Sequence, residues 1–567
     1  MLFHSFAWLA VAVGAIAASG SRNETAKPNF IVIVTDDQDL RMNSLDYMPR
    51  AKKYLTDEGT FFNHHYATVA LCCPARASLW TGKAAHNTNI TNLGPPYGGF
   101  KKFIDEGYNE KWLPVWMKNG GYETYFTGKL MNGHDTKNYD LQLKNMGLTG
   151  HDFFIEPGTY QYWNTTVQHN LDKPKSYPGE FATDLLANKS MKWIDDAVKK
   201  EKPFFLAMNP VNPHGNYDYK TGKFTPPLPK DKYKNAFPDA KVPRNVSFNP
   251  DQPSGASWIR ELRQLNSSVI EENDEFYRAR LQALQSIDDL IETAIETLKK
   301  HNILDNTYII YTSDNGFHIS QHRLTPGKRC PYEEDVNVPL IIRGPGIPKG
   351  QTSDLVTSHL DIAPSIVKWA GAKGPGDFDG AAIPKSGKAD PNEPWEHVEV
   401  EHWGTVSAKQ YVALRNRVNT YKAVRVIGKG YNIFYSVWCE GDHEVYDMTN
   451  DPHQMKNLYN STSKILNTPM SKVQHRLDAL TLVLKACKGR TCQKPWEALH
   501  PDGKVKTLVE ALDSKYDSFY KNQHRVSFDH CALGYIVANE LPIKYAKYGN
   551  ESSTHDERGL EGWNIFP

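Results

Sequence analysis

The chain alternates short runs of β-branched and aromatic residues with longer amphipathic segments. Runs over residues 29–34, 203–208 and 307–313 are typical of strands buried on both faces of a sheet. Apolar residues recur with helical spacing over 181–199 and 272–301. This alternation of strands and helices predicts an α/β fold with a doubly wound sheet.

The same patterns predict further elements in the first 370 residues. The expected helices cover 48–58, 111–119 and 360–370, and the expected strands cover 60–66, 122–129 and 338–343. Residues 215–270 are rich in Pro, Lys, Asp and Asn and show no periodicity. They predict a long surface excursion that is able to shape a substrate entrance.

The pattern changes after a linker rich in Gly, Pro, Ala and Lys at about 371–394. We therefore expect an α/β domain over 21–385 and a smaller α+β subdomain with a tail over 386–567. The expected elements of the subdomain are antiparallel strands over 411–415, 421–426, 431–438 and 445–448 and a helix over 471–487. The sequence does not indicate a role for the tail after Lys494.

Composition indicates a globular protein with no general affinity for nucleic acid or membrane surfaces. The 567 residues contain 66 Lys plus Arg and 65 Asp plus Glu, so the formal net charge is only +1. A chain of this length is expected to form two domains. Because no global field attracts anions, an anionic substrate must be held by a local cationic pocket.

The first residues predict a signal peptide over 1–20. An apolar run over 6–18 is followed by small residues, and no later run reaches about 18 uninterrupted apolar residues, the length of a membrane span. We therefore expect a secreted protein or one in the lumen of the secretory pathway. The expected glycosylation sequons begin at Asn23, Asn89, Asn164, Asn188, Asn245, Asn266, Asn460 and Asn550.

The cysteine count is odd, which leaves at least one thiol outside any disulfide. The seven cysteines are residues 72, 73, 330, 439, 487, 492 and 531. An oxidising compartment would pair most of them. Cys487 and Cys492 are close enough to form a small loop and are the best predicted pair, whereas Cys72 is expected to have another fate.

Polar residues follow the predicted strands where the strands end. Ligands in open α/β sheets gather at the carboxyl ends of strands, so we expect these residues to share a site. They are Asp36, Asp37, Lys129, His214, Asp314 and Asn315. Three carboxylates and an amide oxygen suit Ca²⁺ or Mg²⁺ rather than zinc. Each residue alone has an ordinary structural explanation, and only the coincidence at successive strand ends favours a site.

Residues 71–82 place two cysteines, a proline and an arginine at the start of a predicted helix. Pro74 suits the first turn of a helix. Arg76 then lies close to Cys72, and Arg76, Lys129, Lys328 and His214 are the candidates to hold an oxyanion and to donate protons.

The pattern Cys72-x-Pro74-x-Arg76-Ala77-Ser78-Leu79-x-Thr81-Gly82 resembles the signature of the sulfatase family. Further stretches that are similar to family motifs, in the same order, cover 34–38, 127–129, 313–316, 359–364 and 444–452. The resemblance spans about residues 28–460. Several stretches most resemble the glucosamine-6-sulfatase branch and secreted fungal arylsulfatases. The resemblance implies an alkaline-phosphatase-like α/β fold, with a large mixed sheet flanked by helices and a smaller C-terminal antiparallel sheet.

The resemblance also implies roles for individual residues. Cys72 matches the cysteine that dedicated machinery converts to formylglycine (3-oxoalanine), whose hydrate is the nucleophile. The modified Cys72, Asp36, Asp37, Asp314 and Asn315 would bind one Ca²⁺. Arg76 and Lys129 would hold the hydrate, and Lys328 and His214 would hold the sulfate and help to protonate the leaving oxygen.

The implied function is hydrolysis of sulfuric esters as an arylsulfatase, with N-acetylglucosamine-6-sulfatase activity on sulfated glycans as the alternative. A phosphoester hydrolase of the same fold and an inactive binding homologue are further alternatives. Cys73 occupies a variable position of the signature, so we expect it to pack in the core. Many sulfatases have histidine where this chain has Met131, and Asn132 and His134 are the nearby candidates to replace it.

Overall fold

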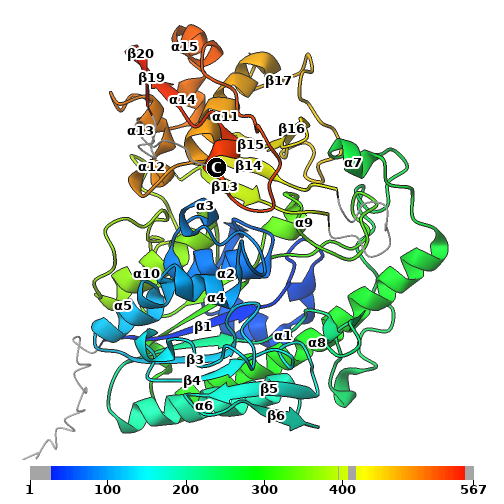
Figure 1. The fold of residues 1–567 in the computed structure, drawn as a ribbon, viewed down its shortest axis with the longest axis vertical. Helices are drawn as coiled ribbons and strands as arrows, with labels where there is room; N and C mark the ends of the chain where they lie inside the picture. Colours follow the sequence, from blue (N-terminus) through cyan, green and yellow to red (C-terminus); the bar gives the residue numbers. More distant parts are fainter. Residues whose placement is uncertain (1–26, 394, 407–416, 556–567) are drawn as a thin grey trace, which may run out of the picture.

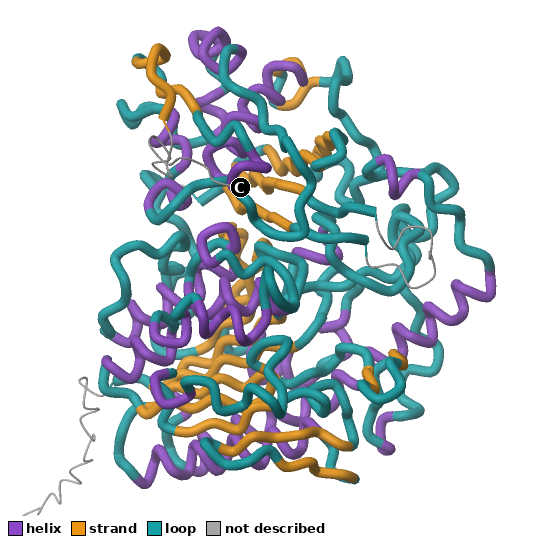
Figure 2. Tube along the Cα trace, in the orientation of Figure 1, coloured by secondary structure: helices purple, strands orange, loops and turns teal. Residues whose placement is uncertain are grey.

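The structure is a computed structural model that describes residues 27–393, 395–406 and 417–555. A large sheet and a small sheet lie one above the other, each covered by helices (Figure 1). In Figure 2 the strands of the large sheet lie together in the lower half of the view. The predicted signal peptide, the sequon at Asn23 and the predicted strand over 411–415 lie outside the described residues. None of the described helices is long and apolar enough to cross a membrane.

The large sheet has ten strands and is mixed, as the resemblance implied. Its order is β12 (Gln351–Ser358), β2 (Thr60–Tyr66), β11 (Leu340–Arg343), β10 (Thr307–Ser313), β1 (Asn29–Thr35), β7 (Phe204–Asn209), β3 (Glu123–Lys129), β4 (Gly150–Phe154), β5 (Asn164–His169) and β6 (Lys175–Pro178). The four neighbouring strands β10, β1, β7 and β3 run parallel. Their carboxyl ends therefore meet at one edge of the sheet.

Helices cover both faces of this sheet, because successive residues of each buried strand point to opposite sides. Phe30, Val32 and Val34 of β1 belong to the core under α2 (Cys72–Thr81), α4 (Gly99–Asp105), α5 (Leu113–Asn119) and α10 (Ile362–Ala370). Ile31 and Ile33 belong to the core under α6 (Ala182–Lys199) and α8 (Ser267–Lys300). Alternation along a single strand thus supplies both hydrophobic cores.

Most predicted elements of this sheet are confirmed, with shifted ends. The predicted helix over 48–58 is a short α1 (Pro49–Ala51) that continues as a π-helical turn (Lys52–Thr56). Helix α8 begins about five residues earlier than predicted, where the Asn266 side chain caps the backbone N–H of Val269 at 3.0 Å.

The outer strands β4, β5, β6 and β12 were not predicted. Strand β5 contains the polar sequence NTTVQH, and β6 is largely exposed. Strand β4 is buried, but its sequence GHDFF is short and interrupted by polar residues, so none of these strands carries a continuous apolar run that would reveal it.

The excursion over 215–270 is mostly loop, with the hairpin β8 (Asn216–Asp218) and β9 (Lys223–Thr225) and the short helix α7 (Ser257–Arg260). Its Tyr233 hydroxyl donates to Asp289 of α8 at 2.7 Å, and the Ser257 backbone N–H donates to Asp442 at 2.8 Å. The excursion therefore connects α8 to the small sheet. A role in shaping a substrate entrance stays a prediction.

The small sheet is an antiparallel meander, as predicted. Its strands are β13 (His397–His402), β14 (Tyr421–Gly428), β15 (Tyr431–Trp438) and β16 (His443–Asp447). Strand β13 was not predicted, because its sequence HVEVEH carries buried charges. One face packs on the large sheet through Tyr421, Ala423 and Phe434, and the other packs on α11 (Met470–Leu484). The division of the chain at 385/386 stays a proposal.

The tail after Lys494 completes the core beside α11. It contributes α13 (Pro495–Leu499), α14 (Leu508–Ala511), α15 (Asp517–Lys521) and β19 (Tyr545–Lys547). The predicted disulfide Cys487–Cys492 is confirmed, and a second disulfide joins Cys439 to Cys531. Cys72, Cys73 and Cys330 are free and buried.

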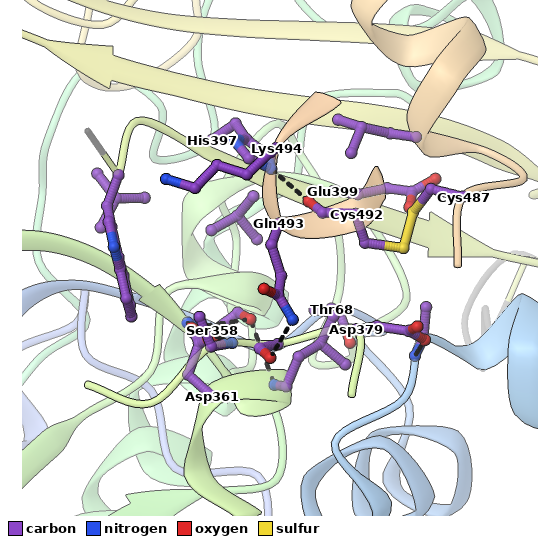
Figure 3. A pocket seen from close by; sticks show the side chains of 18 residues that line it. Thr68, Ser358, Asp361, Asp379, His397, Glu399, Cys487, Cys492, Gln493 and Lys494 are labelled. Atoms are coloured by element: carbon purple, nitrogen blue, oxygen red, sulfur yellow. Dashed lines mark hydrogen bonds between the residues drawn. A yellow bond between two sulfur atoms is a disulfide. The ribbon is translucent and has the colours of Figure 1, made fainter. Parts of the chain in front are cut away.

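A cavity of about 90 Å³ lies between the two sheets beside the Cys487–Cys492 disulfide. Figure 3 shows Glu399 and the disulfide above it and Asp361, Asp379 and Thr68 below. None of the residues that line this cavity belongs to the predicted site, so the site has to be sought at the strand ends.

Candidate active site

The carboxyl ends of β1 and β10 bring the predicted oxygen donors together. Asp36 and Asp37 follow β1, and Asp314 and Asn315 follow β10. The backbone N–H of Asp37 donates to Oδ1 of Asp314 at 3.0 Å, and Nδ2 of Asn315 donates to Oδ1 of Asp37 at 2.7 Å. All four side chains are buried. Three carboxylates and one amide therefore form a single buried cluster.

Cys72 reaches the same position from the first residue of α2. Its Sγ lies 3.4 Å from Oδ1 of Asp36 and 3.9 Å from Oδ1 of Asp37. Leu71 is extended, and Pro74 stands in the first turn, where a missing N–H does no harm. The signature thus starts a helix at the point where residue 72 meets the carboxylates.

Arg76, one turn further along α2, forms the buried floor of the site with Lys129. Nε of Arg76 donates to Oδ2 of Asp314 at 2.8 Å, and its Nη1 donates to the Lys129 carbonyl and to Oδ1 of Asn209 at 3.0 and 3.2 Å. Nζ of Lys129 donates to Oδ2 of Asp36 at 2.6 Å. Both cations are fully buried. Their position suits permanent charge neutralisation within the protein.

Lys328 and His214 occupy the more accessible side. Nζ of Lys328 lies 2.7 Å from Sγ of Cys72 and also contacts Asp37. Nε2 of His214 lies 3.7 Å from Oδ2 of Asp37. The side chains of Lys328 and His214 are 12% and 14% exposed, whereas that of Lys129 is 0% exposed. An incoming anion therefore meets Lys328 and His214 first.

Two further residues at the site were missed by sequence reasoning. The ring of Tyr160 stacks on His214 at 4.2 Å, and Nζ of Lys129 lies 4.8 Å from its centroid. Nη2 of Arg280 donates to the Asp37 carbonyl at 2.5 Å. Tyr160 lies in a loop without periodicity, and Arg280 belongs to the buried face of α8, so neither carried a local signal.

Opposing forces set the protonation of the carboxylates. Burial disfavours the ionised form of Asp36, but Lys129, His214 and Arg76 outweigh burial and lower its pKa to about 2. Asp36 is therefore ionised at neutral pH. Burial also lowers the pKa of His214 below its ordinary value, although nearby carboxylates oppose this shift.

The same environment keeps the Cys72 thiol neutral. Burial, followed by the negative charges of Asp314 and Asp36, raises its pKa well above the ordinary value, although Lys129 and Lys328 oppose the shift. Reactive cysteines have lowered pKa values and positive surroundings. In this environment the unmodified thiol is therefore held in its neutral form.

The donor set fits a hard divalent cation. Ligand atoms of Asp36, Asp37, Cys72 and His214 lie within 4.8 Å of one another. Carboxylate and amide oxygens are the ligands that Ca²⁺ and Mg²⁺ prefer. Asp36 and Asp37 thus belong to a group that is able to hold a metal ion, and Asp314 and Asn315 lie next to it through their contacts with Asp37.

The surroundings of Met131 separate it from the catalytic group. Its Sδ lies 3.7 Å from Sγ of Cys73, in the core between the sheet and α2. The Asn132 side chain donates to the Tyr160 hydroxyl at 2.8 Å, which links it indirectly to the site. His134 stacks on a phenylalanine ring, and burial lowers its pKa to about 3. Cys73 packs in the core, in the way predicted.

Comparison with known proteins identifies the family. The family model described as sulfatase matches residues 28–372, and a model described as N-sulphoglucosamine sulphohydrolase, C-terminal, matches residues 322–481. The arylsulfatase of Chlamydomonas reinhardtii is 36% identical over 95% of this chain and 85% of its own length. The N-acetylglucosamine-6-sulfatase of Capra hircus is 31% identical over 85% of this chain and 88% of its own length.

A solved structure supports the fold. A protein determined in complex with its substrate D-glucosamine-2-N,6-O-disulfate superposes with a TM-score of 0.62 at 21% identity, over 76% of this chain and 94% of that one. The family match covers more than half of the chain, and the predicted alkaline-phosphatase-like α/β fold is confirmed. The chain belongs to the sulfatase family and is a sulfuric ester hydrolase.

Proposed function

We propose that this sulfatase hydrolyses sulfate monoesters with formylglycine at position 72 and one Ca²⁺ held by Asp36, Asp37, Asp314 and Asn315. The single observation that carries the proposal is the position of Cys72 Sγ, 3.4 Å from Asp36 and 2.7 Å from Lys328 Nζ. A neutral thiol at this position is a poor nucleophile, whereas an oxidised residue 72 in its hydrated form would supply an oxygen nucleophile there. Ca²⁺, when bound, would neutralise the carboxylates and polarise the ester.

The exposure of the cationic residues indicates their roles in positioning the site and in binding the sulfate. Arg76 and Lys129 are buried and hydrogen-bonded to Asp314 and Asp36, so they hold residue 72 and its carboxylates in place. Lys328 is the cation within reach of an entering sulfate, and its ammonium group would stabilise the charge on the sulfate oxygens.

His214 is the proposed donor to the leaving oxygen. Its Nδ1 lies 2.8 Å from the Gly215 carbonyl, which is consistent with a proton on Nδ1. Tyr160 packs flat against the ring at 4.2 Å and fixes its plane. Nε2 then lies 3.7 Å from Oδ2 of Asp37, and it donates to the leaving oxygen when the ring is the doubly protonated imidazolium, which the charges of Asp37 and Asp36 favour.

An arylsulfatase is the preferred assignment, because the Chlamydomonas arylsulfatase aligns with 95% of this chain. The alternative is a 6-sulfatase of N-acetylglucosamine residues in glycans, which the goat relative and the glucosamine disulfate complex favour. Rates on an aryl sulfate and on N-acetylglucosamine 6-sulfate, measured with one preparation, discriminate between the two.

We further propose that the protein is secreted and glycosylated. Five predicted sequon asparagines are exposed, which is the condition for carrying a glycan: Asn164, Asn188, Asn266, Asn460 and Asn550. Asn89 and Asn245 are partly buried. Two disulfides fit an oxidising compartment, and residues 1–20 provide the proposed signal peptide.

Mass spectrometry of the peptide that contains residue 72 tests the proposal. The protein should be isolated from a secretory host that carries the cysteine-oxidising machinery. We expect the mass of an aldehyde in place of the thiol, together with sulfate release from an aryl sulfate. An intact thiol in a preparation that releases sulfate would overturn the role of formylglycine.

A further inference from the structure

Arg329 directly follows Lys328 and has no carboxylate partner in the part of the chain that the structure describes. Its Nη1 donates to the Thr405 carbonyl at 3.3 Å, and no ion pair within the described residues involves its guanidinium. The stretch 407–416, outside the described residues, contains neither Asp nor Glu. Arg329 is only partly exposed. A half-buried guanidinium without a counter-ion is unusual, because a buried charge normally requires one.

The backbone holds Arg329 in an unfavourable conformation. Its φ is 89°, in the left-handed region that side-chain-bearing residues rarely adopt. The neighbouring backbone is fixed on both sides: the N–H of His318 donates to the Gly327 carbonyl at 2.8 Å, and the N–H of Cys330 donates to Oδ2 of Asp335 at 2.8 Å. Asn419 donates to the Arg329 carbonyl at 2.9 Å. Strain that is maintained in this way is typical of functional positions.

The position of Arg329 in the chain connects it to the active site, because Arg329 directly follows Lys328. Burial lowers the pKa of Arg329 below the ordinary value of an arginine. Arg329 in turn acts on His402, whose pKa is lowered to about 3, first by burial and then by this guanidinium. Arg329 thus lies between Lys328, whose Nζ is 2.7 Å from Sγ of Cys72, and the segment that follows β13 of the small sheet.

His402 is a second group without a partner. It is the last residue of β13, it is fully buried, and neither ring nitrogen has a hydrogen-bond partner within the described residues. Residue 404 is glycine. Any other residue there would place its Cβ 3.1 Å from Nε2 of His402, so the glycine leaves space next to this nitrogen. Buried polar atoms are normally paired. His402 thus has unused hydrogen-bonding capacity and lies three residues before Thr405, which Arg329 contacts.

We propose that Arg329, with His402 beside it, binds a second anionic group of the substrate, such as another sulfate or a carboxylate. The inference deepens the proposed sulfate ester hydrolysis and rests on it. Lys328 and His214 already serve the scissile sulfate, and Arg76 and Lys129 hold the carboxylates around residue 72, whereas Arg329 contacts the segment after β13. The preferred substrates are then sulfate esters with at least two negative groups.

The test compares two matched pairs of substrates. The first pair is a nitrophenyl sulfate without and with a ring carboxylate, and the second is glucosamine 6-sulfate with an acetyl or a sulfo group on the 2-amino nitrogen. Within each pair, the ratio of kcat/KM for the more anionic ester to that for its partner is measured. The ratio is independent of the fraction of active enzyme, so incomplete folding does not affect it.

We expect the wild-type ratio to exceed about ten in at least one pair, which is the range of one charge-assisted hydrogen bond. Arg329→Gln should lower this ratio toward one, through a higher KM for the more anionic ester, and Arg329→Lys should restore part of it. His402→Phe should lower it by a smaller factor. Arg417→Gln is the matched control, because Arg417 is already paired with Glu261 and Glu440, and it should leave the ratio unchanged.

Three results would overturn the inference. The wild-type ratio could be near one in both pairs, Arg329→Gln could leave a high ratio unchanged, or it could reduce both rates equally. The last result would assign Arg329 to the scissile sulfate or to the loop alone. Absence of sulfate release from every ester would instead refute the proposed function, so the two failures are distinguishable.

Discussion

Two buried clusters of charged residues in this molecule have similar composition and different exposure. At the strand ends, Asp36, Asp37 and Asp314 meet Arg76, Lys129 and Lys328. Between the sheets, Glu401 meets His86 at 2.9 Å and Lys422 at 2.6 Å, and Lys422 also meets Glu540 at 3.4 Å. Both clusters contain groups of side chains that are able to hold a metal ion.

The two clusters differ in the exposed fraction of their side chains. The side chains of His86, Glu401, Lys422 and Glu540 are each at most 3% exposed, and these residues come from four separate segments. The cluster at the strand ends instead has Lys328 and His214 partly exposed and the free cysteine Cys72 in contact with its acids. Buried charge alone therefore does not mark an active site. A reactive position together with one accessible side does.

The largest expected effect concerns residue 72. Cys72→Ala should lower kcat for an aryl sulfate by about 10⁴-fold or more, because it removes the nucleophile. The free energy of unfolding should change by less than about 2 kcal/mol. Cys73→Ala is the matched control in the same helix turn and should retain activity. Equal losses in the two variants would contradict the assignment of Cys72.

The second prediction concerns the fully buried cluster between the sheets, which contains Glu401, His86, Lys422 and Glu540. Glu401→Gln should lower the free energy of unfolding by about 3–5 kcal/mol, because it leaves Lys422 and His86 buried with less compensation. Denaturant unfolding measures this loss. The kcat/KM of the folded fraction should stay within about twofold of wild type, because the cluster is separate from the strand ends. A large loss of kcat/KM with unchanged stability would show that this cluster takes part in catalysis.

Substitution of Lys328, the partly exposed cation of the cluster at the strand ends, should affect activity more than stability. Lys328→Met should lower kcat/KM by about 10²–10³-fold, because a charge that stabilises the transition state is lost. Its effect on the free energy of unfolding should be smaller than that of Lys129→Met, since Lys129 is fully buried between carboxylates. Steady-state kinetics and thermal melting of both variants test this order, and an inverted order would refute the division by exposure.

Metal binding should stabilise only the cluster at the strand ends. Chelation should reduce activity, and Ca²⁺ at about 100 times its Kd should raise the free energy of unfolding by about 2.7 kcal/mol. Asp314→Asn should weaken this gain, whereas Glu401→Gln should preserve it. Melting temperatures against Ca²⁺ concentration provide a readout apart from activity. An equal gain in the Asp314→Asn protein would place the ion elsewhere.

The smallest effect is a pH dependence of stability from Glu399. Burial, and then the charge of Glu401, raises its pKa to about 7. The folded protein therefore holds a proton that the unfolded chain releases near pH 4.5, so this contribution is fully present at low pH and is lost as pH rises through about 7. Glu399→Gln should flatten the slope of the free energy of unfolding between pH 5 and 7, by about 1–3 kcal/mol in total. An unchanged slope would contradict the raised pKa.

The sequence determined the central strands and the residues at their ends. Uninterrupted apolar runs identify β1, β7 and β10 because these strands are buried on both faces, and polar residues that follow them are recognisable in the chain itself. The register of Cys72 with Pro74 and Arg76 is likewise a local property, because one helix turn sets their spacing.

Only the tertiary structure decided which side chains complete the site and which charges are exposed. Tyr160 comes from a loop, and Arg280 comes from the buried face of α8. Arg329 is distinguished by the lack of a counter-ion among the described residues, which no sequence pattern reveals. Strand β13 escaped detection because its Glu401 is buried, where it pairs with Lys422 on the neighbouring strand β14 and with His86. Contacts between distant segments set burial and pairing, and these determine which charges can act on a substrate.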